Sequence, residues 1–320
     1  YNWGEYISDG AEDTLDVNKE FEKETGIKVN YTTYDSNENM YNKIKGGGAN
    51  YDIVIPSDYM IERMINEDLL EKINLDNIPN YKNIMPKYKN LYYNVGMVGL
   101  VYNTKMVEGT PDSWSIMWDQ KYKGQVLMFN NSRDAFGIAQ FLLGIDINTT
   151  NAQDWEKAYE KLKEQKPIVQ SYVMDDVFNK MEGGEAAIAA YYAGDCISMA
   201  ENNPDLAFVY PKEGTNIFVD SICIPKGCQN KEAAELYINF MLRGDIALAN
   251  AEYMCYATPN QAVLDNEEYS LRDNEMLYPD EEHTPPTEYF HNLDSEMLML
   301  MTSLWDNLKI EGNNDRSVYI

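Results

Sequence analysis

The first 75 residues alternate between amphipathic helix patterns and short apolar strand patterns, and this alternation constrains the fold more than any other feature. Val17 and Phe21 stand four residues apart in a segment rich in Glu and Lys, which predicts a helix that ends at Gly26. Residues 27–31 alternate as a strand, and residues 53–55 predict a short buried strand. This rhythm indicates a parallel, doubly wound α/β sheet.

Similar patterns continue along the chain. Asn37 is positioned to cap a second helix, which should stop at the glycines 46–48. Further on we expect a short helix over Trp114 and Trp118, strands over 126–129 and 186–192, a helix after Asp134, and helices around 155–163, 231–242 and 298–308. The length of 320 residues exceeds what a single hydrophobic core usually serves, so two domains are expected.

The charge balance is strongly acidic. The chain has 53 Asp plus Glu against 26 Lys plus Arg, which gives a formal net charge of −27. Such a surface repels nucleic acid and acidic lipid and concentrates cations, although it also suits any soluble acidic protein. No segment approaches the ~20 apolar residues that span a bilayer, and the start without Met or an apolar leader is typical of a mature or trimmed chain.

The four cysteines lack a CxxC spacing, and the only histidines are His283 and His291. A zinc site of the usual Cys/His spacing is therefore not supported, and we expect no metal and no cofactor. We expect the thiols to be buried as small hydrophobic groups, although an exported protein could pair two of them.

A family resemblance is carried by an ordered series of segments. Residues 1–6, 22–29, 35–41 and 51–57 closely resemble bacterial spermidine/putrescine-binding proteins. The match continues in the same order through Trp114 to Trp118, 122–124, Arg133 and Asp134, 211–214, 219–221 and 256–260. No single motif is diagnostic, but the series covers nearly the whole chain.

The resemblance implies the two-lobed, type II periplasmic-binding-protein fold, in which each α/β lobe is a doubly wound sheet flanked by helices. The lobes would close like a hinge on a ligand in the cleft between them. The first lobe would comprise 1–103 and 221–280, and the second 104–220 and 281–312. The implied function is that of an extracytoplasmic substrate-binding protein of a polyamine ABC importer, either in the periplasm or lipid-anchored on the cell surface. It would act as a monomer with the importer's permease subunits as partners.

A polyamine is a flexible apolar rod with ammonium ends, so its site needs carboxylates for the ends and aromatic faces for the methylenes. The resemblance puts the aromatic box on Trp3, Tyr6, Tyr59, Tyr192, Phe218 and Tyr256. The amine-binding acids fall on Asp134 and Asp220, with Glu5 and Asp195 beside the same loops. Further candidates for the site are Ser57, Asp58, Asn131 and His291.

These residues have structural alternatives as well. A buried carboxylate at Asp220 would be costly unless it meets a cation, which favours a ligand role. Asp134 follows Arg133 and could instead cap a helix. Tyr59 and Tyr256 could be core aromatics, and Asp58 and Glu5 could be solvated charges at the rim of the site.

Four candidates depart from the family pattern. Tyr192 and Phe218 stand where tryptophans are common, Asn131 where a carboxylate can occur, and His291 where a glutamine can. The loss of a carboxylate would weaken recognition of one ammonium group. A shorter diamine, or another amine, is therefore an alternative ligand.

The family has a segment between the positions of Tyr93 and Asn94 that is absent here, and residues 313–320 resemble it. We therefore predict that 313–320 is a displaced hinge-crossing segment, strand-like over 316–320, which lies beside Tyr93 and Asn94. A permuted chain, or a biosensor with a reporter domain inserted at the hinge, would account for this order.

An enzyme is the rival class. The acids Asp175 and Asp176 could in principle serve hydrolysis, but adjacent side chains diverge. No Ser-His-Asp set is indicated, and the glycines 46–48 lack the Lys-Ser/Thr of a phosphate loop. A sugar-binding protein could share the aromatics and acids, whereas an anion-binding protein would favour Arg. We expect a binding protein without catalytic activity.

Overall fold

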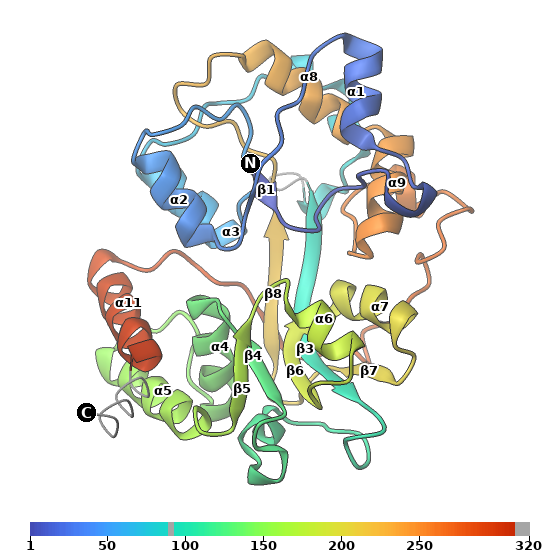
Figure 1. Cartoon of the computed structure of the whole chain (residues 1–320). Coiled ribbons are helices and arrows are strands. Elements are labelled where there is room, and N and C mark those ends of the chain that lie inside the picture. Colours follow the sequence, from blue (N-terminus) through green and yellow to red (C-terminus); the bar gives the residue numbers. More distant parts are fainter. Residues whose placement is uncertain (89–92, 311–320) are drawn as a thin grey trace, which may run out of the picture. The chain divides into compact units, whose positions relative to one another are not determined.

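The computed structural model describes residues 1–88 and 93–310, which form two compact units (Figure 1). Unit 1 comprises Tyr1–Met97, Ala193–Ser198 and Ile217–His283, and unit 2 comprises Val98–Tyr192, Met199–Asn216 and the chain from Thr284 onward. The division at 103/104, 220/221 and 280/281 that the sequence suggested stays a prediction. The tail 313–320 lies outside the described residues, so its expected place beside Tyr93 and Asn94 also stays a prediction.

Helix α1 (Val17–Thr25) in unit 1 begins and ends as its sequence predicts. The Asp16 side chain accepts a hydrogen bond from the Lys19 backbone N–H, which caps the first turn. Gly26 follows the last turn with φ at 72°, a left-handed conformation that glycine adopts without steric cost. Val17 and Phe21 are buried, so the predicted apolar stripe is confirmed.

Two predictions for the early chain were wrong in detail. Helix α2 (Asn37–Lys45) is capped by Ser36, and Asn37 is its first residue. Residues 27–31 form no strand, because the N–H of Val29 donates to the Glu22 carboxylate at 2.7 Å instead of to a neighbouring strand. The strand β2 (Thr33–Tyr34) follows later and pairs in parallel with β1 (Asn2–Trp3).

The short strand expected at 53–55 is reduced to one bridge, in which Val54 and Cys223 exchange two backbone hydrogen bonds. The helices that complete unit 1 are α3 (Asp58–Asn66), α8 (Lys231–Met241), α9 (Gly244–Met254) and α10 (Gln261–Leu264). Its 3-10 turns are Ala11–Asp13, Leu75–Asn77, Pro79–Asn83 and Pro86–Tyr88.

The strand β3 (Asn94–Asn103) belongs to both units, with 94–97 in unit 1 and 98–103 in unit 2. In unit 1 it pairs antiparallel with β8 (Thr215–Asp220), in the register Asn94↔Asp220 and Gly96↔Phe218. The sequence predicted a parallel sheet, but the sheet has both parallel and antiparallel pairs. The reason is that β3 pairs with later strands, β6 and β8, that run in the opposite direction.

In unit 2 the strand order is β5, β4, β6, β3, with β7 also paired to β3. The parallel strands are β4 (Val126–Phe129), β5 (Val169–Val173) and β6 (Ile188–Tyr192), while β3 and β7 (Leu206–Val209) run antiparallel to each other. The strand β9 (Thr287–Glu288) pairs in parallel with the start of β8. All four residues of β4 are buried, so β4 is central to the core of this unit.

Three helices of unit 2 pack side by side (Figure 1): α4 (Ser132–Leu143), α5 (Ala152–Gln165) and α11 (Ser295–Ile310). Trp305 of α11 contacts Phe136 and Tyr172, and Met301 and Leu308 are buried, so the helix expected around 298–308 is confirmed and packs on this unit. The remaining elements are α6 (Val177–Glu182), α7 (Ala193–Asn202), which begins in unit 1, and the 3-10 turns Trp114–Trp118 and Gln120–Tyr122.

Cys196, Cys223 and Cys255 are buried, Cys228 is partly exposed, and none of these four described residues forms a disulfide. Burial raises the pKa of Cys223 to about 12, so this thiol stays protonated and unreactive at neutral pH. Within residues 1–88 and 93–310, none of the helices combines the length and apolar character needed to cross a bilayer.

The cap of α1 gives a first prediction. Asp16→Ala should lower the free energy of unfolding by about 1 kcal/mol, because the Lys19 N–H loses its acceptor. Lys19→Ala is the matched control: it removes only the exposed ion pair of Asp16 with a side chain that is 81% accessible, so stability should hardly change. Urea denaturation followed by circular dichroism measures both variants, and equal losses would show that the ion pair matters instead of the cap.

Candidate functional site

The centre of the candidate site in unit 1 is a buried carboxylate that accepts a hydrogen bond from a tyrosine. Asp220, at the end of β8, is only 3% exposed, and its Oδ2 lies 2.5 Å from the Tyr6 hydroxyl. Burial, followed by the negative charge of Asp220, raises the pKa of Tyr6 well above 10. Tyr6 therefore stays protonated and donates to Asp220 at any physiological pH.

The backbone around Asp220 explains why this carboxylate is held so firmly. Its carbonyl accepts from the Tyr93 N–H at 2.9 Å, beside its pairing with Asn94 on β3. On the other side Asp220 forms a bridge with Ser57, and the Ser221 N–H donates to the Pro56 carbonyl. The sheet hydrogen bonds thus fix Asp220 before any ligand arrives.

Several aromatic rings pack around Tyr6, the donor to this carboxylate. Tyr256 meets Tyr6 edge to face at 5.3 Å, and the Phe218 ring lies 6.5 Å from Tyr256. The Tyr256 hydroxyl donates to Asp195 Oδ2 at 2.9 Å. Tyr93, which the sequence did not single out, packs on Tyr6 and donates to its carbonyl at 2.6 Å. The structure therefore brings five of the predicted site residues into one cluster.

Trp3 and Glu5 take different places in the N-terminal segment. The Trp3 indole N–H donates to the Ile55 carbonyl at 2.8 Å, and its ring is half-buried against Tyr34, whose hydroxyl donates to the same carbonyl. Glu5 is exposed and has a positive φ of 51°. Trp3 is thus anchored close to Ser57, while Glu5 lies at the surface of the unit.

Asp58 and Tyr59 are held by structural contacts at the start of α3. The Asp58 carboxylate accepts from the Val219 N–H and from the Tyr59 N–H, so it connects this helix to β8. The buried Tyr59 hydroxyl accepts from Asn37 and donates to Glu38. Asn37 also accepts from the Ser57 N–H at 3.0 Å. These contacts favour supporting roles around the cluster.

Unit 2 repeats the combination of carboxylate and tyrosine. Asp134, in the first turn of α4, is 7% exposed, and the Tyr192 hydroxyl donates to its Oδ2 at 2.7 Å. The cap of α4 is Asn131, whose side chain accepts from the N–H groups of Arg133 and Asp134. The alternative in which Asp134 is the cap is therefore wrong. Tyr192 packs against Phe129 at 5.0 Å.

Asn148 holds the segment 289–291 close to the start of α4. Its Oδ1 accepts from Arg133 Nη2 at 2.9 Å and from the His291 N–H at 2.7 Å, and its amide donates to the Tyr289 carbonyl. The Arg133 guanidinium also lies 4.6 Å from the Phe290 ring centre. His291 itself is exposed.

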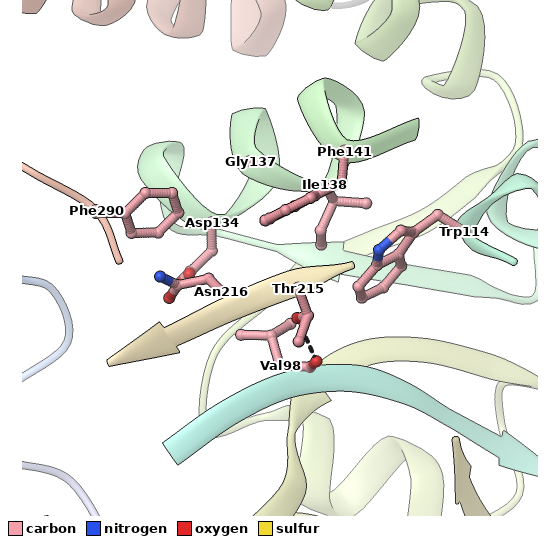
Figure 2. Close-up of a pocket in the computed structure, with 9 residues that line it drawn as sticks. All are labelled: Val98, Trp114, Asp134, Gly137, Ile138, Phe141, Thr215, Asn216 and Phe290. Carbon is pink, nitrogen blue, oxygen red and sulfur yellow. Dashed lines mark hydrogen bonds between the residues drawn. The ribbon is translucent and has the colours of Figure 1, made fainter. Parts of the chain in front are cut away.

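A small hollow lies behind Asp134, between α4 and the start of β8 (Figure 2). Figure 2 shows Phe290 beside Asp134, with Trp114 at the far end, and Thr215 hydrogen-bonded to the Val98 carbonyl. The accessible volume is about 10 Å³, which is room for one water molecule at most. This hollow is too small for a polyamine.

In the part of the chain that the structure describes, no group of three or more His, Cys, Asp or Glu side chains is arranged to hold a metal ion. The carboxylates Asp220 and Asp134 instead accept from tyrosine hydroxyls, which provide a hydrogen bond but no positive charge.

Comparisons with known proteins identify relatives that match most of the chain. A family described as bacterial extracellular solute-binding protein matches residues 17–276. The spermidine/putrescine-binding periplasmic proteins of Salmonella typhimurium and Escherichia coli K12 are each 35% identical, over 88% of this chain and 82% or 83% of theirs. The putrescine-binding periplasmic protein PotF of Escherichia coli K12 is 29% identical, over 87% of this chain and 82% of its own.

Solved structures agree with these relatives. A protein assigned as a spermidine/putrescine ABC transporter from Listeria monocytogenes is 35% identical, with a TM-score of 0.91 over 97% of this chain and 98% of that one. The substrate-binding protein PotD from Streptococcus pneumoniae is also 35% identical, with a TM-score of 0.75 over 97% of both chains. The predicted fold class is thereby confirmed.

The Asn148 contacts give a second prediction. Asn148→Ala removes the acceptor of the His291 N–H, so amide hydrogen exchange around 289–291 should speed up about tenfold or more. Asn148→Asp is the matched control, since it keeps the acceptor for Arg133 and His291 and should exchange more slowly than Asn148→Ala. Exchange measured by mass spectrometry tests this, and unchanged exchange in Asn148→Ala would mean that other contacts hold the segment.

Proposed function

Because the chain belongs to the family of bacterial extracellular solute-binding proteins, we propose that it is the substrate-binding protein of a polyamine ABC importer. It works outside the cytoplasm, binds a spermidine- or putrescine-like cation, and delivers this cation to the permease subunits. It acts as a monomer and does no chemistry on its ligand. The names of its relatives, which include binding proteins for both amines, support this proposal.

The observation that carries the proposal is the carboxylate of Asp220 among Tyr6, Phe218 and Tyr256. Asp220 is only 3% exposed, and a carboxylate is costly to bury unless hydrogen bonds or a cation offset that cost. An alkylammonium group would supply a positive charge and N–H donors that suit a carboxylate. The adjacent rings offer apolar faces to methylenes and cation–π contact to the ammonium.

A second carboxylate suits the second ammonium group of the ligand. Asp134 is buried in unit 2 with Tyr192 as its donor, so each unit contributes one acid and one tyrosine. We propose that the two units close on the ligand and that each binds one end of it. The family resemblance puts Asn131 where a carboxylate can occur, and its side-chain oxygen caps α4. With one acid fewer for the ammonium groups, we propose a short diamine over a longer polyamine.

The net charge supports the same ligand class. An excess of 27 negative charges raises the local concentration of polycations and speeds their encounter with the protein. This effect is screened by salt, whereas contacts with the buried acids are screened less. Binding should therefore weaken with salt without disappearing.

Ligand binding gives a third prediction. Putrescine or spermidine at about 100 times its dissociation constant should stabilise the protein by about 2.7 kcal/mol, which raises the melting temperature by several degrees. The shift should shrink as sodium chloride rises from about 50 to about 500 mM. Differential scanning fluorimetry measures both effects.

The matched control ligand is 1,4-butanediol, which has the carbon chain of putrescine without its charges. It should produce no shift, because it cannot neutralise Asp220 or Asp134. No shift with any di- or polyamine would refute the polyamine proposal. A shift with a sugar or a quaternary amine alone would point to another ligand of the same fold.

A fourth prediction ranks the two acids. Asp220→Asn should weaken putrescine binding by about 10- to 100-fold, since a charge-assisted hydrogen bond contributes roughly 1.5–3 kcal/mol. Asp134→Asn should cost less, because Asp134 is the less buried of the two. Asp306→Asn is the control: it changes the net charge equally but lies exposed on α11.

Isothermal titration calorimetry measures the three variants at one salt concentration. Negligible effects of both buried changes would mean that these acids do not bind the ligand. A loss of the same size in Asp306→Asn would mean that net charge alone governs affinity.

A further inference from the structure

We propose that Gly96 is a positioning residue of the amine site, because only a residue without a side chain lets the Phe218 ring lie where it borders Tyr256. This inference rests on the proposed function and deepens it. Gly96 and Phe218 both lie in unit 1, on neighbouring strands. Neither a charge nor a hydrogen bond marks Gly96 in the sequence.

The geometry at Gly96 is steric. Gly96 and Phe218 stand directly opposite each other in the antiparallel pair of β3 and β8, so a side chain at Gly96 would point to the same face as Phe218. A Cβ atom at Gly96 would lie 2.3 Å from Phe218 Cζ, 2.8 Å from Cε2 and 2.9 Å from Cε1. The ring therefore covers the glycine, and any other residue would displace it.

The position of the Phe218 ring matters for the proposed ligand. Phe218, Tyr256 and Tyr6 pack in sequence beside Asp220, and we call these three rings the aromatic row. Residues two apart on a strand share a face, so Phe218 and Asp220 point to the same side of β8. The Phe218 ring neighbours Tyr256, and Tyr256 packs on Tyr6, the donor to Asp220. If a side chain at position 96 displaced the Phe218 ring, the apolar surface that we assign to the methylenes of the ligand would change its width.

The chain contains a matched control for this contact. Gly99 lies three residues further along β3, and a Cβ there would lie 2.3 Å from Phe208 Cζ and 2.8 Å from Cε2, as well as 2.8 Å from the Val209 carbonyl oxygen. Phe208 packs on Tyr210 in unit 2 instead of on the aromatic row of Asp220. A Cβ at either glycine meets a phenylalanine ring, and at Gly99 it meets a backbone carbonyl as well, but only Gly96 supports a proposed site residue.

The experiment compares Gly96→Ala with Gly99→Ala, using putrescine and spermidine as the probes in isothermal titration calorimetry. Gly96→Ala should weaken binding about tenfold, and Gly99→Ala should stay within about twofold of the wild type. The melting temperature of ligand-free Gly99→Ala should fall at least as much as that of Gly96→Ala, since its Cβ also meets the Val209 carbonyl. Wild-type affinity in Gly96→Ala, or an equal loss in Gly99→Ala, would overturn the inference.

A double-mutant cycle shows whether Gly96 acts through the ring. Phe218→Leu keeps an apolar side chain but removes the ring, so adding Gly96→Ala to it should cost less than about twofold in affinity. A further tenfold loss in that background would overturn the inference. This comparison also serves if Gly96→Ala alone fails to fold, because the double variant lacks the clashing ring atoms.

The same titrations separate this inference from the function on which it rests. A wild-type protein that binds no di- or polyamine refutes the proposed function, and the assignment of Gly96 falls with it. Wild-type binding that is retained in full by Gly96→Ala refutes the role of Gly96 alone.

Discussion

The pairing of β3 with β8 is the constraint on which the site in unit 1 depends. It places Asp220 opposite Asn94 and Phe218 opposite Gly96, which puts the acid and the ring on one face of β8, two residues apart. A slip of one residue would turn both side chains to the other face. Tyr6 and Tyr256 come from distant parts of the chain, but they converge on this face because the carboxylate and the ring are fixed there.

Unit 2 also pairs a buried acid with a tyrosine, but there a helix carries the acid. Asp134 is carried by a helix whose start is held by the Asn131 cap, and Tyr192 comes from the end of β6. In both units the acid accepts from a tyrosine and has an anchored backbone without any ligand. Less side-chain ordering remains to be done on binding, which lowers the entropic cost of association.

Sequence patterns predicted correctly those features of the fold that depend on neighbouring residues. The end of α1 at Gly26 and the strand β4 depend on nearby residues, and the sequence was enough for both. The expected strand at 27–31 failed because Glu22 takes a backbone donor that a sheet would use, and no periodicity reveals such a competitor. The residues of the candidate site also differ in whether the sequence could reveal them. Asp220 and Asp134 follow from the family resemblance, whereas Asn148 acts on a segment more than 140 residues away and leaves no local signal.

The tyrosine donors to Asp220 and Asp134 bear on the kind of ligand that we propose for the site. An arginine or lysine partner would cancel the carboxylate's charge, and the site would then attract an ammonium group no more than a neutral one. A hydroxyl stabilises the carboxylate and leaves its charge intact. Burial beside Asp220 raises the pKa of Tyr6, so this donor cannot ionise and add a competing negative charge of its own. A tyrosine donor that stays neutral suits the cation-binding role that we propose for this site.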